Sequence, residues 1–140
     1  MSLRAGSFAS IRSGFVPWDA TLESAAGLVG NARVIGLPVV DDDRHVVGWI
    51  SQRELMPIVL TPRLGQAPVA DYMSPEVIVA DQNDSLTDLV DLMQLTESEA
   101  VTVVANGICL GVVTRCDILR FVSQARRKFP VAQVPVAQEG

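Results

Sequence analysis

Apolar and polar positions follow an order that occurs twice along the chain. In each copy a Ser or Thr precedes apolar residues spaced three and four positions apart, which is typical of an amphipathic helix. This spacing predicts one helix over Leu22–Val29 and a second over Leu86–Leu95. Two short runs rich in β-branched residues follow each helix and predict strands. These strands are expected at Leu37–Val40, Val46–Ile50, Val101–Val104 and Ile108–Val113.

A comparison of the chain with itself indicates a duplication. Thr21–Ala26 resembles Ser85–Val90 at an offset of 64 residues, and Gly48–Leu55 resembles Gly111–Ile118 at an offset of 63. The offset drops by one because the second copy is one residue shorter. The deletion falls in the turn between two strands, where deletions are tolerated.

The two copies predict a division of the chain into tandem units. The expected units are residues 1–61 and 73–128, joined by a linker at 62–72 and followed by an extended or disordered tail at 129–140. A further helix is expected at the end of each unit, and the second is expected over Arg115–Lys128, with Ile118, Leu119 and Val122 on its apolar face. The predicted fold class is therefore α+β, with the order β-α-β-β-α in each unit.

Composition and charge narrow the class of protein. Of 140 residues, 49% are hydrophobic, which is enough for a folded core. A net charge of -5 argues against a nucleic-acid binder, whose affinity rests on clustered basic residues. No apolar run approaches the roughly 18 to 20 residues of a membrane-spanning helix. The number and spacing of Cys109 and Cys116 are typical of neither a disulfide framework nor a zinc ribbon. We therefore expect a cytoplasmic protein without a membrane span, in which both thiols are reduced and buried.

A short motif recurs where the last strand of each unit meets its final helix. Ser51 and Glu54, like Thr114 and Asp117, have the spacing of a capping box, in which a hydroxyl and a carboxylate accept free backbone N–H groups. The same arrangement also suits a ligand, because a helix N-terminus attracts anions. A carboxylate at that position also suits the hydroxyls of a ribose. The motif alone leaves both interpretations open.

These motifs, in this order, resemble paired CBS domains, named after cystathionine β-synthase. The resemblance rests on Leu-Pro-Val-Val, an acidic turn, Val-Val-Gly-x-Ile-Ser and Gly-Val-Val-Thr-Arg-Cys-Asp-Ile-Leu, and covers roughly Gly6–Phe121. It implies two units packed about a pseudo-twofold axis, with two clefts for adenosyl ligands such as AMP, ADP, ATP or S-adenosylmethionine. It also implies a homodimer, no required cofactor, and a regulatory module that acts on an effector protein or domain.

The resemblance further implies that each cleft takes residues from both units. The first cleft would use Thr114, Arg115, Asp117 and Val112 with Val34, Ile35, Gly36, Ser7 and Ser10. The second would use Ser51 and Glu54 with Ser98, Glu99 and Ala100. In the second cleft, Glu54 replaces the usual aspartate and Glu99 adds a negative charge in the path of an anion. We therefore expect the first cleft to bind the ligand more strongly.

Several other residues admit two interpretations. His45 after three aspartates suits either a metal site or a solvated turn. Cys116 suits either a redox-sensitive thiol or a packed small residue. Trp18 and Trp49 suit either stacking on adenine or filling of the core.

Three classes of function compete on the sequence. The first is a ligand sensor and the second is a structural dimerisation domain with empty clefts. An enzyme is disfavoured, because the chain has one histidine and no nucleophile beside a recognisable base.

Overall fold

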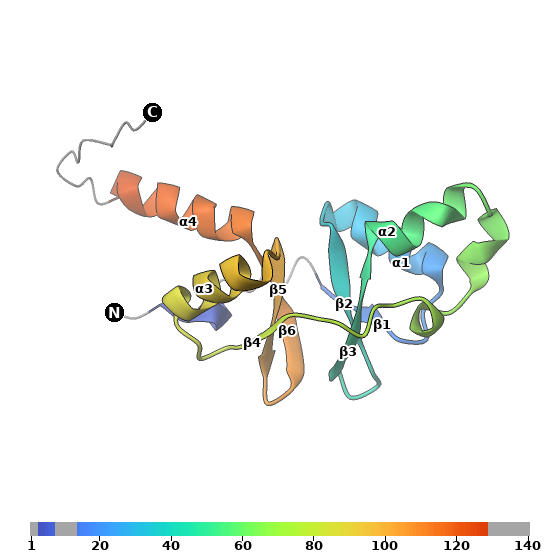
Figure 1. The fold of residues 1–140 in the computed structure, drawn as a ribbon, viewed down its shortest axis with the longest axis horizontal. Helices are drawn as coiled ribbons and strands as arrows, with labels where there is room; N and C mark the ends of the chain where they lie inside the picture. Colours follow the sequence, from blue (N-terminus) through green and yellow to red (C-terminus); the bar gives the residue numbers. More distant parts are fainter. Residues whose placement is uncertain (1–2, 8–13, 129–140) are drawn as a thin grey trace.

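The computed structural model describes residues 3–7 and 14–128, which form two three-stranded sheets with their helices (Figure 1). In both sheets the first strand pairs parallel with the second, and the second pairs antiparallel with the third. The strands are β1 (Val16–Pro17), β2 (Gly36–Val40), β3 (Val46–Ser51), β4 (Val79–Asp81), β5 (Ala100–Ala105) and β6 (Ile108–Thr114). The expected α+β class and the duplicated β-α-β-β-α unit are confirmed.

The four α-helices are α1 (Leu22–Ala32), α2 (Gln52–Leu55), α3 (Leu86–Thr96) and α4 (Arg115–Lys128). The side chains of Thr21 and Ser85 cap α1 and α3, each accepting a backbone N–H at 3.1 Å. Both helices run past the predicted ends and stop at Arg33 and Glu97, whose left-handed backbone has φ of 58° and 56°. A left-handed C-cap is usually glycine, so the sequence carried no stop signal at either residue.

The described residues also form four short 3-10 helices: η1 (Ala5–Ser7), η2 (Met56–Val59), η3 (Pro62–Gln66) and η4 (Val69–Asp71). Buried Val69 belongs to the core of the first sheet, so part of the predicted linker packs against that unit. Ala5 is buried in the core of the second sheet, and its N–H donates to the Asp84 carbonyl at 2.7 Å. A segment of the predicted linker thus packs in the first core, and a segment assigned to the first unit packs in the second.

Each unit has its own core between its sheet and its helices. Leu22, Leu37 and Ile50 are fully buried in the first core. Leu89 and Met93, from the stripe expected on α3, are buried in the second. The two sheets also face each other in the middle of the molecule (Figure 1). All five residues of β2 are buried, which requires cover on both faces of that strand.

The hairpin tips of the two units are tied together by Arg44. Its carbonyl accepts the N–H of Cys109 at 2.9 Å, and its guanidinium donates to the Cys109 carbonyl at 2.9 Å. The same guanidinium lies 4.9 Å from the centre of the Phe15 ring, within the range of a cation–π contact. The next residue, His45, forms a backbone bridge with Ile108. These contacts fix the relative position of the hairpins.

The apolar face predicted for α4 is wrong in part. Ile118 is buried, but Leu119 is 66% exposed and Val122 is 38% exposed. In Figure 1, α4 runs away from the end of β6 and lies beside α3. Among residues 3–7 and 14–128, no helix combines the length and apolarity needed to cross a membrane.

We expect Gly107→Ala to destabilise the contact between the hairpins. Gly107 has φ of +82°, and an added Cβ would lie 2.9 Å from Cδ2 of His45. The left-handed backbone alone costs an alanine about 1–2 kcal/mol in free energy of unfolding. Urea unfolding should show this loss. The matched control is Gly27→Ala in α1, where the new methyl group meets nothing within 4 Å. That variant should gain about 0.5–1 kcal/mol. Equal stability of Gly107→Ala and the unchanged protein would contradict this account.

Candidate ligand clefts between the two units

A cavity of about 550 Å³, which we call cleft A, lies where the two units meet. Its volume falls in the range of small-molecule sites, roughly 300–1,000 Å³. One wall is the end of α1 and the segment after it, residues 31–35, and the other is the end of β6 and the first turn of α4, residues 114–117, with Arg120. Glu99, just before β5, completes the lining. Both units therefore supply the wall of one cavity.

The structure brings together most residues expected in the first cleft. Thr114, Arg115 and Asp117 line cleft A together with Val34 and Ile35. Val112 and Gly36 are buried within β6 and β2 and do not belong to the lining. Ser7 lies on η1, beside the second core, and does not line the cavity either. Ser10 lies outside the described residues. Binding of a ligand by this set stays a prediction.

Thr114 and Asp117 form a capping box at the start of α4. The Thr114 N–H donates to Asp117 Oδ2 at 2.9 Å, and the Asp117 N–H donates to Thr114 Oγ1 at 3.1 Å. Arg120 approaches the other carboxylate oxygen, with 3.5 Å between its Nη1 and Asp117 Oδ1. Both oxygens of Asp117 thus have partners in this structure. A ribose that bound this carboxylate would have to take Oδ1 from Arg120.

Positive charge predominates in cleft A. Arg33, Arg115 and Arg120 line it, against the two carboxylates of Asp117 and Glu99. The N-terminus of the 14-residue helix α4 adds the positive end of its dipole. The Nε of Arg115 donates to the Ser98 carbonyl at 3.1 Å, which joins the helix start to the loop before β5. These charges make the cavity suited to an anionic ligand.

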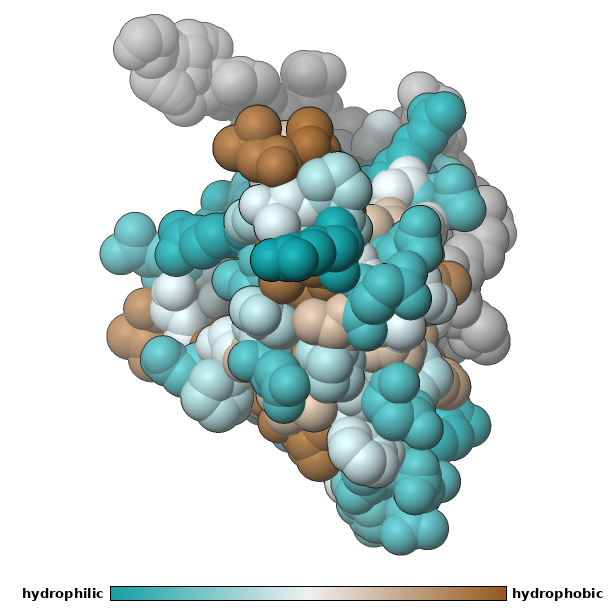
Figure 2. Space-filling model, turned by 90° about the vertical axis from the view of Figure 1, so that its right-hand side faces the viewer, coloured by the Kyte–Doolittle hydropathy of each residue, from teal (hydrophilic) through white to brown (hydrophobic). Residues whose placement is uncertain are grey.

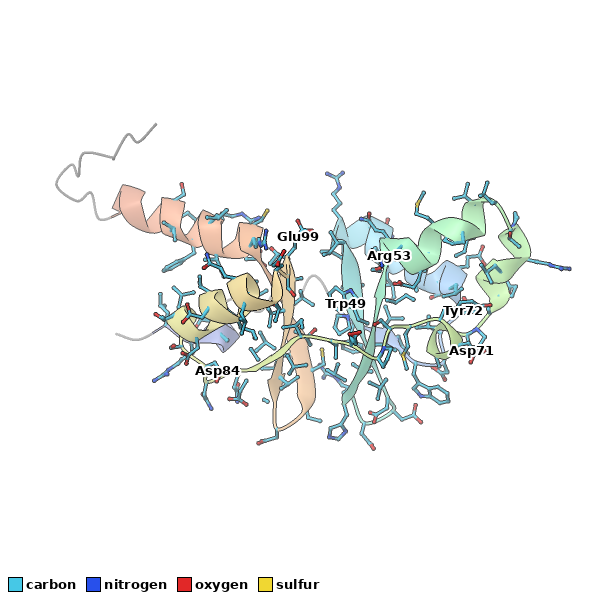
Figure 3. All side chains as sticks on the ribbon, in the orientation of Figure 1. Trp49, Arg53, Asp71, Tyr72, Asp84 and Glu99 are labelled. Carbon is cyan, nitrogen blue, oxygen red and sulfur yellow. The ribbon has the colours of Figure 1, made fainter. Side chains whose placement is uncertain are left out.

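A second cavity of about 290 Å³, cleft B, is acidic. Glu76, Glu97 and Glu99 line it, together with Trp49 and the predicted residues Ser98 and Ala100. Among residues 3–7 and 14–128, no basic side chain belongs to this lining. Figure 3 shows Trp49 on the first unit and Glu99 on the second, on opposite sides of the contact between the sheets. An anion would meet unfavourable charge in cleft B.

Ser51 and Glu54 do not line cleft B. The N–H and the hydroxyl of Ser51 both donate to Glu54 Oε1, at 2.7 and 2.6 Å. The N–H of Arg53 donates to Ser51 Oγ at 3.2 Å and completes the capping box. The longer glutamate side chain folds back onto its own cap. In this structure the motif therefore has its structural role.

Sequence reasoning missed several residues of the clefts. Arg120 follows Asp117 by three positions on a helix, a spacing that brings two side chains together, so it was detectable. Arg33 was not, because its place in cleft A depends on the left-handed turn that ends α1. Glu76 and Glu97 reach cleft B through the packing of the two units. No local pattern indicated them.

The two cysteines differ, which corrects the expectation that both are buried. Cys109 is fully buried in β6, whereas Cys116 is exposed and lines cleft A. Burial raises the pKa of the Cys109 thiol, partly offset by a hydrogen bond with the Gly111 backbone and by the Arg44 charge. The thiol of Cys109 is thus uncharged and enclosed, while that of Cys116 is accessible.

The acidic turn before β3 has the geometry of a solvated turn. Ligand atoms of Asp41, Asp43 and His45 lie within 4.8 Å of one another. However, Asp41 Oδ1 already accepts the backbone N–H groups of Asp43 and His45, at 2.9 and 2.8 Å. These bonds form an Asx turn, which accounts for the acidic residues at these positions without a bound metal. Nearby, the Nε1 of exposed Trp18 donates to Asp42 at 3.1 Å, so this ring lies on the surface and not in a cleft.

The two thiols should react very differently. With a thiol reagent at pH 8, we expect one cysteine of the folded protein to react quickly and both to react after denaturation, because only Cys116 is exposed. The absorbance of the group that the reagent releases gives the number of cysteines that have reacted. In Cys116→Ser, the folded protein should show no fast reaction. A fast reaction in that variant would contradict the burial of Cys109.

Comparison with known proteins adds a family and several relatives. The family model described as CBS domain matches residues 16–60 and 69–124. Protein MJ1004 of Methanocaldococcus jannaschii is 25% identical over 76% of this chain and 50% of its own length. An inosine-5'-monophosphate dehydrogenase of Thermoplasma acidophilum is 30% identical over 81% of this chain and 21% of the enzyme. The chain therefore spans half or less of these two relatives.

Solved structures share the fold. A structure of CBSX2 from Arabidopsis thaliana has a TM-score of 0.77 at 26% identity, over 91% of this chain and 99% of that chain. A structure of CBSX2 in complex with AMP has a TM-score of 0.74 at 28% identity, over 89% of this chain and 99% of that one. The likeness covers nearly the whole of both chains.

Proposed function

Because the chain belongs to the CBS domain family, with two matched units, we propose that it is a regulatory module that binds an adenosine-containing ligand in cleft A. The observation that carries the proposal is the composition of cleft A. The cavity combines a helix N-terminus, two carboxylates and three arginines with the end of α1 and the segment after it. The CBSX2 structure in complex with AMP supports the same class of ligand.

Each part of the ligand has a matching group in cleft A. Phosphate oxygens would accept hydrogen bonds from the N–H of Cys116 and from the guanidinium of Arg115. The N–H groups of Arg115 and Asp117 already donate to the Glu99 carbonyl and to Thr114 Oγ1. The ribose hydroxyls would donate to Asp117 in place of Arg120. The base would lie against the apolar side chains of Val34 and Ile35. The ligand would therefore contact both units at once.

A ligand held by both units gives the module a means of regulation. Its binding favours one relative packing of the units, and any effector that contacts both of them would respond to that packing. The effector would be a partner protein or a further domain. No catalytic step is part of this proposal, and the chain would require no cofactor.

The first test is Asp117→Asn, which removes the charge but keeps an oxygen that can accept the Thr114 N–H. We expect affinity for an adenine nucleotide to fall at least about tenfold, because bonds to a charged acceptor contribute about 1.5–3 kcal/mol each. The free energy of unfolding should change by less than about 1 kcal/mol. Isothermal titration calorimetry and urea unfolding measure the two quantities.

Glu54→Gln is the matched control for this test. It makes the equivalent change in the twin capping box, which lines neither cleft, and should leave nucleotide affinity unchanged. Protection of Cys116 supplies an independent readout, because a ligand in cleft A should slow its alkylation. If AMP, ADP, ATP, adenosine and S-adenosylmethionine all fail to slow alkylation and to raise the melting temperature, the proposal is wrong.

A ligand-free dimerisation domain is the alternative, and the exposed apolar side chains favour it. Leu119 and Val122 are exposed on α4, and Met56, Val59 and Leu60 are exposed after α2. Figure 2 views the end of the molecule that carries η2 and η3, where apolar groups in brown lie among polar ones in teal. A second copy of the chain would cover such side chains, so we propose a homodimer under either function.

Leu119→Glu tests the homodimer. We expect this variant to sediment as a monomer in analytical ultracentrifugation, at a concentration where the unchanged protein sediments as a dimer. Leu95→Glu, on α3, is the matched control, since Leu95 is 83% exposed and lies on a different helix. If the unchanged protein is a monomer, or if both variants remain dimers, α4 does not form the interface.

A further inference from the structure

The two clefts carry opposite charge at equivalent positions of the repeat. Arg33 and Glu97 both end a helix in the left-handed conformation, with φ of 58° and 56°, and are separated by the repeat offset of 64 residues. Arg33 lines cleft A, and Glu97 lines cleft B. Because the backbone conformation is the same at these two residues, the difference in charge at this position comes from their side chains.

The other charged residues of the clefts extend this difference. At the offset of 63 residues, Arg115 and Arg120 of cleft A correspond to Gln52 and Pro57, which carry no charge. Cleft B has three carboxylates, those of Glu76, Glu97 and Glu99. None of the three forms an ion pair or a side-chain hydrogen bond within residues 14–128. Glu99 also lines cleft A with its arginines, whereas Glu76 and Glu97 line cleft B alone, and their negative charge repels a phosphate.

The three arginines of cleft A are divided between its two walls. Arg115 and Arg120 belong to α4 of the second unit, and Arg33 ends α1 of the first. Arg115 is tied to Ser98, and Arg120 is paired with Asp117. Arg33 has no ion pair or hydrogen bond from its side chain in the part of the chain that the structure describes. It is an uncompensated cation facing the same cavity.

We propose that cleft A selects a nucleoside di- or triphosphate over a monophosphate, that one nucleotide binds per chain, and that Arg33 determines this specificity. The inference rests on the proposed function and names its ligand more closely. A single phosphate at the start of α4 contacts only the wall that the second unit provides. Additional phosphates extend toward the opposite wall, where Arg33 neutralises their charge. The carboxylates of cleft B exclude a second nucleotide.

Calorimetric titration with adenosine, AMP, ADP and ATP tests the proposal, in buffer with EDTA at constant ionic strength. We expect ADP or ATP to bind about five- to tenfold more tightly than AMP, with a stoichiometry of one. In Arg33→Gln that preference should disappear, while the affinities for adenosine and AMP stay within about twofold. Arg53→Gln is the matched control, because exposed Arg53 on α2 lines neither cleft. It should keep the preference.

The outcomes separate this inference from the proposed function. If AMP binds as tightly as ADP and ATP, or if Arg33→Gln weakens all four ligands equally, the specificity is wrong and the adenosine-binding function stands. If two nucleotides bind per chain, the exclusion from cleft B is wrong. If none of the four binds, both proposals are overturned. Unfolding curves of Arg33→Gln establish that the variant is folded before its affinities are compared.

Discussion

Each small sheet must have both of its faces covered, and the rest of this structure depends on that constraint. The helices pack on the outer face of each sheet, and the inner face is covered by the other unit (Figure 1). The buried residues Val40, Cys109 and Val112 lie in neither single-unit core. Burial of apolar surface contributes about 25 cal/mol per Å² to the free energy of unfolding. Separation of the two units would therefore cost each of them a substantial part of its stability. Both clefts exist only because the units pair.

Duplication explains how one fold carries two different cavities. The capped helices, the strand pairing and the left-handed helix ends are the same in both copies. What differs is the side chain at equivalent positions, above all Arg33 against Glu97, and the wall of the cavity, because the start of α4 lines cleft A and the start of α2 does not line cleft B. Electrostatic character can thus change without altering the backbone, because exposed residues at helix ends make few packing contacts. A paired module can keep one cleft for an anion and lose this capacity in the other.

The sequence predicted what depends on local patterns. The positions of β2, β3, β5 and β6 followed from the hydrophobic period, and the starts of α1 and α3 followed from the capping residues Thr21 and Ser85. No position was predicted for the short strands β1 and β4. The pairing of Thr114 and Asp117 with Val34 and Ile35 came from the family resemblance, and the structure places these residues around one cavity. Arg33, the isolation of Ser51 and Glu54 from cleft B, and the exposure of Cys116 depend on how the units pack. Local patterns carry no information about that packing.

The most direct test of the account is a crystal structure of the protein grown with excess ADP. The account predicts one ADP per chain in cleft A, with its ribose on Asp117, its phosphates between the start of α4 and Arg33, and no nucleotide in cleft B. An ADP in cleft B, or an ADP in cleft A without contacts to Asp117 and Arg33, would contradict it.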